Sequence, residues 1–354
     1  MVPASAFSHF HEQGAESGTA STAASTPAPT PQLDILTSNQ DPVDAYRVNM
    51  THLELFNNLF SKEFLSIDES EQPDDIPVTI YSKHALTTPY LMHQVLAISA
   101  LHLSTRTSES CEFYREYAAG LQNRALSLFN ESNPMLEVTP ANCVHMFLFS
   151  SLVGVHLLCD TLHYQRDSFE GFIDRFTHCL SVSRGVLTVM EHSWPLLRET
   201  ELGPRLEWSQ VLMQSTDESG SECAALHDLI NATDASPSSR KAYHESVLHL
   251  QQVFNAQRVA PGHKIRTPLV LKWPILLSPD YVAFLRQQQA EALVILAHYA
   301  VLLHRGRDLW LIGEGGRFLI ESICSSLGPG WQEWLKFPRA ALEEDLTADK
   351  PSWT

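Results

Sequence analysis

The sequence predicts an all-α fold, organised as one large multi-helix domain. Two long segments, 89–104 and 290–305, are apolar at the 3.6-residue spacing of a helix, and almost no charge lies on their other faces. Helices of this kind must be enclosed by other helices, which indicates a large core. We find no alternating polar and apolar runs flanked by Gly-Asn turns, so no sheet is expected. Hydrophobic residues make up 44% of the 354 residues, enough to fill such a core.

Residues 1–40 differ in composition from the rest of the chain. They are rich in Ser, Thr, Ala and Pro and contain few large apolar side chains. A segment of this kind buries too little surface to offset the entropy lost on ordering. We therefore expect a disordered tail or linker at 1–40, a helical domain at 41–340 and a C-terminal tail at 341–354.

Within the domain, the hydrophobic spacing places the expected helices near 43–64, 88–106, 110–130, 140–159, 167–191, 222–232, 239–258, 279–305, 307–327 and 329–336. Proline fits the first position of a helix, and three of these starts carry it, as Thr88-Pro89, Thr139-Pro140 and Ser278-Pro279. Loops are expected at 66–86, 192–221, 231–238 and 260–278, with short extended pieces at 78–81 and 269–271.

The charge balance argues against direct binding of nucleic acid. The net charge is −17, from 41 acidic and 24 basic residues, and the basic residues are scattered, with Arg240-Lys241 as their densest pairing. A nucleic-acid surface needs clustered Lys and Arg. The first basic residue is Arg47, so neither a secretory signal nor a mitochondrial presequence is recognisable. The apolar run at 144–158 is too short to span a bilayer, and we expect a buried helix there and no membrane insertion.

The cysteines do not form a metal site. They lie at 111, 143, 159, 179, 223 and 324, and none is within ten residues of another. Tetrahedral zinc sites use cysteine pairs two to four residues apart on tight turns. We therefore predict reduced thiols in the core, with neither zinc nor disulfides.

Other candidate sites also have a simpler interpretation. The paired acids Asp74-Asp75 resemble an aspartate-rich Mg²⁺ site, which needs its carboxylates on a helix. Prolines flank the pair and argue against a helix, so a solvated acidic loop or an acidic interaction segment is favoured. The glycines of the 311–318 segment, Gly313, Gly315 and Gly316, lack the Lys-Ser/Thr of a phosphate loop and favour helix packing. Six histidines on apolar helices are interpreted as core residues without metal spacing: His93, His102, His145, His156, His298 and His304. The sequence predicts no catalytic, cofactor-binding or metal-binding residues, and the ligand-binding residues are unknown.

Several short motifs, each present once, follow one another along the chain. They are THLELFNNLF at 51–60, Met92-His93 followed by Ala-Leu-His-Leu at 100–103, Ala125-Leu126 with Phe129, Thr139 with Asn142-Cys143 and Phe147, Phe149, Ser150 and Ser151, Arg184-Gly185-Val186, and Trp331 to Pro338. In this order they resemble the regulatory domain of fungal binuclear-zinc-cluster transcription factors, in the branch of the sterol uptake control protein. The resemblance covers about 45–340. The six-cysteine DNA-binding module of that family is absent from this sequence.

The resemblance implies a transcriptional regulator without its own DNA-binding module. Such a domain would reside in the nucleus, or shuttle to it from the cytoplasm. It would act on sterol or secondary-metabolite genes through protein partners of the transcription machinery or a related factor. The sterol-responsive relatives bind a hydrophobic small molecule. A cavity for such an effector between 144–158 and 290–305 is therefore the second interpretation of these helices, beside a filled core. It would use the room left by small residues, namely Ser150, Ser151, Gly154, Ala297 and Ala300.

Three alternatives stay open at the level of sequence. The chain could be an enzyme or accessory protein of a fungal biosynthetic pathway that reuses the helical scaffold, although no catalytic motif supports an enzyme. A zinc cluster could lie in an upstream exon outside this sequence. A homodimer is compatible with everything above.

Overall fold

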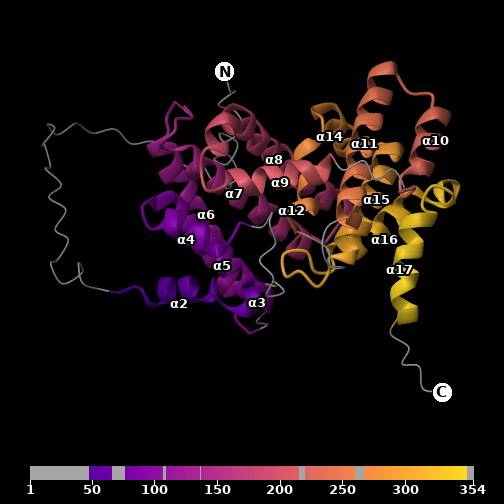
Figure 1. Cartoon of the computed structure of the whole chain (residues 1–354). Coiled ribbons are helices and arrows are strands. Elements are labelled where there is room, and N and C mark those ends of the chain that lie inside the picture. The colour runs from indigo at the N-terminus through magenta and orange to yellow at the C-terminus, as the bar shows by residue number, and fades with distance from the viewer. Residues whose placement is uncertain are drawn as a thin grey trace, which may run out of the picture.

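The computed structural model describes residues 48–65, 76–106, 109–135, 137–214, 220–259 and 267–348. Over these ranges the chain forms sixteen α-helices and no β-strand, which confirms the predicted all-α fold (Figure 1). The expected tail at 1–40 and the last residues of the chain lie outside the described residues.

The helices are, in order, α2 (Met50–Asn58), α3 (Lys62–Leu65), α4 (Val78–Ala85), α5 (Pro89–Arg106), α6 (Cys111–Ser132), α7 (Cys143–Tyr164), α8 (Phe169–Arg198), α9 (Gly203–Met213), α10 (Ala224–Ala232), α11 (Pro237–Val259), α12 (Thr267–Val270), α13 (Lys272–Leu276), α14 (Pro279–Arg286), α15 (Ala290–Arg305), α16 (Gly315–Leu327) and α17 (Lys336–Ala348). A 3-10 turn, η3 (Pro329–Trp331), separates the last two helices.

Two buried clusters organise the packing. Helices α4 to α7 and the end of α8 enclose one cluster, in the half of Figure 1 drawn from indigo to magenta. The larger cluster surrounds α15 and extends to α5 and α8. Helix α15 itself packs mainly against α16, α17 and α11. Every residue of α15 from Ala292 to His304 is buried. The prediction that this apolar helix is enclosed by others is therefore confirmed.

Two of the three proline-marked helix starts are confirmed. Helix α5 begins at Pro89, and the Ser278 hydroxyl caps α14 by accepting a hydrogen bond from the backbone N–H of Tyr281. The start predicted at Thr139-Pro140 is wrong, because α7 begins three residues later, at Cys143. The Asn142 side chain accepts a hydrogen bond from the Thr139 N–H at 2.7 Å and closes a separate turn ahead of the helix.

Four helices lie where loops were predicted. They are α4, α9, α12 and α13, so the piece expected to be extended at 78–81 is helical, and the one at 269–271 is the end of α12 followed by a turn. Each is short, between four and eleven residues, and too few turns repeat for the helical spacing to stand out. Tertiary packing selects these helices, since α4 lies on α5, and α13 lies on both α8 and α11.

Several predicted boundaries also move. Helix α8 continues through Pro195 to Arg198, although a loop was expected from 192. The single helix expected at 279–305 is divided at Gln288, which has a φ of 53°. Helix α17 runs from Lys336 to Ala348 and so crosses the boundary expected at 341 between the domain and the C-terminal tail.

A long-range contact ties α3 to the turn between α15 and α16. The Trp310 indole N–H donates a hydrogen bond to the Phe64 carbonyl at 3.0 Å, and the two ring centroids lie 5.6 Å apart. The buried His102 ring lies edge-on to both, with centroids 5.3 Å from Phe64 and 5.0 Å from Trp310. The beginning of the described chain is thus fixed to a segment near its end.

Candidate functional site

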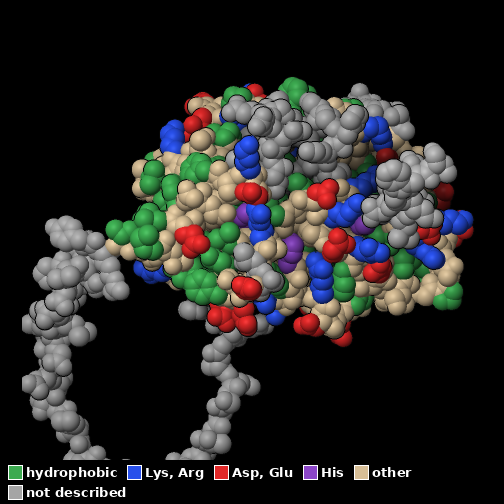
Figure 2. Space-filling model, turned by 90° about the horizontal axis from the view of Figure 1, so that it is seen from below, with side chains coloured by type: hydrophobic (Ala, Val, Ile, Leu, Met, Phe, Trp, Pro, Cys, Tyr) green, Lys and Arg blue, Asp and Glu red, His purple; other side chains and the backbone are tan. Residues whose placement is uncertain are grey.

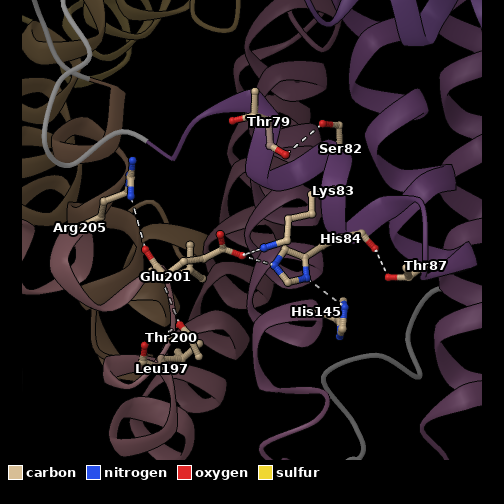
Figure 3. A network of polar contacts seen from close by, with 11 residues as sticks. Thr79, Ser82, Lys83, His84, Thr87, His145, Leu197, Thr200, Glu201 and Arg205 are labelled. Atoms are coloured by element: carbon tan, nitrogen blue, oxygen red, sulfur yellow. Dashed lines mark hydrogen bonds and ion pairs between the residues drawn. The ribbon is translucent and has the colours of Figure 1, made fainter.

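Three polar side chains from distant parts of the sequence meet beside α4 (Figure 3). His84 lies in the last turn of α4, His145 in the first turn of α7, and Glu201 in the turn between α8 and α9. His84 Nε2 lies 2.8 Å from Glu201 Oε1, and His84 Nδ1 lies 3.1 Å from His145 Nε2. The result is a continuous Glu–His–His chain of hydrogen bonds, which we call the His84 cluster.

Lys83 adds a cation at the outer side of this cluster. Its ammonium Nζ lies 2.9 Å from Glu201 Oε1, so the carboxylate accepts from both Lys83 and His84. These two hydrogen bonds, first from Lys83 and then from His84, lower the pKa of Glu201 below its ordinary value. Burial, and then the nearby His84, lower the pKa of His145, which favours its neutral form.

The turn after α8 positions Glu201. The Thr200 hydroxyl donates to the Leu197 carbonyl at 2.7 Å, and the Leu202 N–H donates back to that hydroxyl at 3.2 Å. The Arg205 guanidinium donates to the Glu201 carbonyl at 3.4 Å (Figure 3). This local side-chain bonding holds the turn and directs the carboxylate at α4.

The chemistry available to the His84 cluster is proton transfer through its hydrogen bonds, between the two imidazole rings and the Glu201 carboxylate. Nucleophilic catalysis also needs a hydroxyl or thiol within hydrogen-bond reach of the base. No hydroxyl or thiol of the described residues makes a hydrogen bond to either imidazole ring. The nearby Cys143 thiol has a pKa raised by burial, so it is a poor nucleophile. The cluster is therefore a polar junction between α4, α7 and the α8–α9 turn.

The two helices expected to enclose an effector cavity pack against different neighbours. Helix α7 packs mainly against α5 and α8, whereas α15 packs mainly against α16, α11 and α17. A Cβ on Gly154 would contact the Ser183 hydroxyl of α8 at 3.4 Å, so this glycine faces α8 and not α15. Ala297 and Ala300 are fully buried in the larger cluster. The small residues thus serve separate helix contacts.

Ser150 and Ser151 do not point into a shared cavity either. Their hydroxyls donate to the carbonyls of Met146 and Phe147, one turn earlier in the same helix, at 2.7 and 2.8 Å. This back-bonding satisfies a hydroxyl inside an apolar helix without any ligand. Both serines are therefore accounted for within α7.

Of the six histidines predicted to be core residues, His102, His156, His298 and His304 are buried, whereas His93 and His145 are only half-buried. His298 is fully buried and its Nδ1 lies 2.9 Å from the Val294 carbonyl, while His93 Nδ1 lies 2.8 Å from the Pro89 carbonyl. His102 Nδ1 lies 3.1 Å from the Asn58 amide nitrogen. Burial is the main cause that lowers the pKa of His102, His156 and His298 to about 4. His145 instead takes part in the His84 cluster.

The glycines of 313–316 serve helix packing, as predicted. A Cβ on Gly316 would lie 2.2 Å from the His304 backbone nitrogen, so only glycine lets α16 approach α15 this closely. Gly313 has a φ of 49°, a conformation that favours glycine. The segment is therefore a close helix–helix crossing.

Four cysteines are buried and two are half-buried, and all six are free thiols. Among the described residues, no group of three or more His, Cys, Asp or Glu side chains could hold a metal ion. Asp74-Asp75 lies outside the described residues.

One described helix, α7, is long and apolar enough to cross a membrane, but 67% of its most apolar window is buried within the fold. The buried core helix of a globular domain meets the same criteria of length and apolar composition.

Comparison with known proteins adds no relative. No family model matches the chain, and no curated protein matches it. The His84 cluster was not predicted from the sequence, which named His145 only as a core residue. No local pattern links Glu201 to His84 and His145, because the three residues are brought together only by tertiary packing.

Proposed function

We propose that this chain is the effector domain of a fungal transcriptional regulator of the zinc-cluster type. One observation carries the proposal most directly: residues from separate motifs that carry the resemblance meet in one buried cluster. The members of this cluster include Ala125, Leu126, Phe129, Cys143, Phe147 and Phe149. Phe129 and Phe149, from different motifs, stack at 4.6 Å. Motif residues that are far apart in the sequence are thus packed against one another, which supports the proposal that the motifs belong to one domain.

The domain would act through protein partners and not by touching DNA. The net charge of −17 opposes binding to a polyanion, and contacts with other proteins carry no such penalty. In this proposal the protein works in the nucleus on sterol or secondary-metabolite genes. It joins the transcription machinery or a factor that supplies the DNA-binding module.

A reporter assay tests the proposal. The whole chain, fused to a heterologous DNA-binding domain in a fungal host, should change expression of a reporter bearing the matching sites. The matched control is the same fusion with Phe129→Asp, which places an unpaired charge in the shared cluster and should remove the effect. Unchanged expression with a fusion that is present, nuclear and folded would count against the proposal.

A hydrophobic effector belongs to the same proposal. A saturating apolar ligand stabilises a folded protein, by about 2.7 kcal/mol at 100 times its dissociation constant. A thermal-shift screen with sterols and related lipids should therefore raise the melting temperature of the wild-type chain. If no lipid shifts it, the domain acts without an effector of this class.

A further inference from the structure

Large apolar side chains are exposed on α2 and on the first turn of α6. Met50, Leu53 and Phe113 expose 71%, 52% and 53% of their surface. Met50 and Leu53 lie three residues apart on α2 and share one face of that helix. Figure 2 shows this end of the molecule at the left, where hydrophobic side chains gather with acidic ones among them.

Side-chain contacts join the two helices into one surface. Tyr114 of α6 donates its hydroxyl to Glu54 of α2 at 2.8 Å, and the His52 and Tyr117 ring centroids lie 6.1 Å apart. Phe113 stacks on Tyr117 at 5.7 Å. We call this surface the α2–α6 face, made of Met50, Leu53, Phe113, Tyr114 and Tyr117. Its aromatic rings are held by their neighbours, so they need not be ordered on binding.

The rim of the α2–α6 face is acidic. Three exposed glutamates are sequence neighbours of its apolar residues: Glu54 follows Leu53, Glu112 precedes Phe113, and Glu116 precedes Tyr117. The basic residue among them, Arg115, turns away, with its guanidinium 3.3 Å from the Asp160 carboxylate and 4.5 Å from the centre of the Tyr164 ring. The face therefore offers apolar anchors surrounded by negative charge.

We propose that the α2–α6 face binds a basic amphipathic helix of a partner protein. Apolar residues of that helix would cover Leu53 and Phe113, and Lys or Arg at its edges would face Glu54, Glu112 and Glu116. An apolar centre with aromatic anchors and a charged rim is the usual anatomy of such an interface. Opposite charges on the rim would speed association and select the partner.

Two other occupants fit the charges less well. Residues 1–46 of this chain contain no Lys or Arg, so they cannot supply the basic rim. A second copy of the chain would bring the same glutamates against Glu54, Glu112 and Glu116, and like charges across an interface are unfavourable. A basic partner protein removes both difficulties.

This inference rests on the proposed function, since it gives the chemistry of a partner through which the regulator acts. Its test is a binding measurement that contains no DNA and no transcription. Failure of the binding test would therefore leave the reporter result untouched, and the reverse also holds.

The test uses the full chain and a labelled 18-residue peptide of Leu and Lys at amphipathic helical spacing, followed by fluorescence anisotropy. We expect Leu53→Glu and Phe113→Ser each to weaken binding about tenfold or more. The matched control is Leu248→Glu, because Leu248 is equally exposed, at 54%, but lies on α11. This control should leave the affinity unchanged. Glu112→Gln with Glu116→Gln should weaken binding and reduce its dependence on salt.

Three results would overturn the proposal. The first is equal weakening by Leu53→Glu and Leu248→Glu, which would mean that the peptide binds anywhere on an acidic protein. The second is equally tight binding of a Leu/Glu peptide of the same spacing. The third is a dimer in sedimentation that Leu53→Glu dissociates, which would assign the face to a second copy.

Discussion

Trp310 and Phe64 lie 246 residues apart in the chain, yet the Trp310 indole N–H donates to the Phe64 carbonyl at 3.0 Å. His102 lies against both rings, so a residue of the central helix α5 completes the contact. The hydrogen bond and the ring contacts together attach the short helix α3 to the fold. Helix α3 has only four residues, and beside this contact its Glu63 carboxylate lies 3.7 Å from the Arg106 guanidinium of α5.

Replacing Trp310 should therefore loosen this attachment. Trp310→Phe removes the donor to the Phe64 carbonyl and part of the ring contact, and should lower the free energy of unfolding by about 1–3 kcal/mol. Urea denaturation measures the loss. The control is Trp208→Phe, at a tryptophan that is exposed on α9, which should change stability by no more than about 0.5 kcal/mol. Equal losses in both variants would contradict the role of the contact.

Gly316→Ala should be one of the most damaging small substitutions in the domain. The added Cβ would meet the backbone of α15 at 2.2 Å, and a backbone cannot move aside as a side chain can. We expect a loss of about 3 kcal/mol from overpacking. Gly120→Ala is the matched control, since a Cβ there meets nothing within 4 Å inside α6. It should stabilise the protein by about 0.5–1 kcal/mol, and similar melting temperatures for the two variants would count against the close crossing.

Stability should fall as the pH drops below 6.5. Burial lowers the pKa of His102, His156 and His298 from 6.5 to about 4, so in this window the unfolded chain takes up protons before the folded state does. Each histidine should then cost about 1 kcal/mol of stability between pH 6.5 and 5.5, and its contribution is complete only about one pH unit above 6.5, where the imidazole of the unfolded chain is almost fully neutral. Denaturation of His298→Phe at both values should show a loss smaller by about 1 kcal/mol. An unchanged loss would show that His298 titrates alike in both states.

The thiols should react in two groups. Cys143, Cys159, Cys179 and Cys223 are buried, and burial raises the pKa of Cys179 to about 12. Only the thiolate attacks a disulfide reagent, so these four should label only when the protein opens. Native titration with an aromatic disulfide should release at most two equivalents quickly, from the half-buried Cys111 and Cys324. Rapid labelling of all six would contradict the buried core.

The long helices could be predicted from the sequence and the short ones could not. Helix α15 repeats its apolar spacing over four turns, and its enclosure follows from the lack of a polar face. Helix α4 has only two turns and follows Pro77, so its sequence resembles a loop until it packs on α5. Length decides how much of a periodic signal accumulates.

The candidate site was beyond prediction for a different reason. The spacing of His84, His145 and Glu201 in the sequence is set by the lengths of the helices and turns between them, and it repeats no known motif. His145 was identified as a histidine on an apolar helix, but its partner His84 belongs to a helix that was predicted as a loop. The packing of short helices therefore limits the prediction of sites as well as of folds.

The link between Phe64 and Trp310 also bears on how the chain is made. A ribosome adds about 5–20 residues per second, so the Phe64 carbonyl waits on the order of 10–50 s before its donor has been synthesised. During that interval the first helices carry apolar side chains such as Leu55 and Phe56 that the later helices have not yet covered. The docking of α3 on Trp310 therefore comes late in the folding of these helices, after α15 has been made.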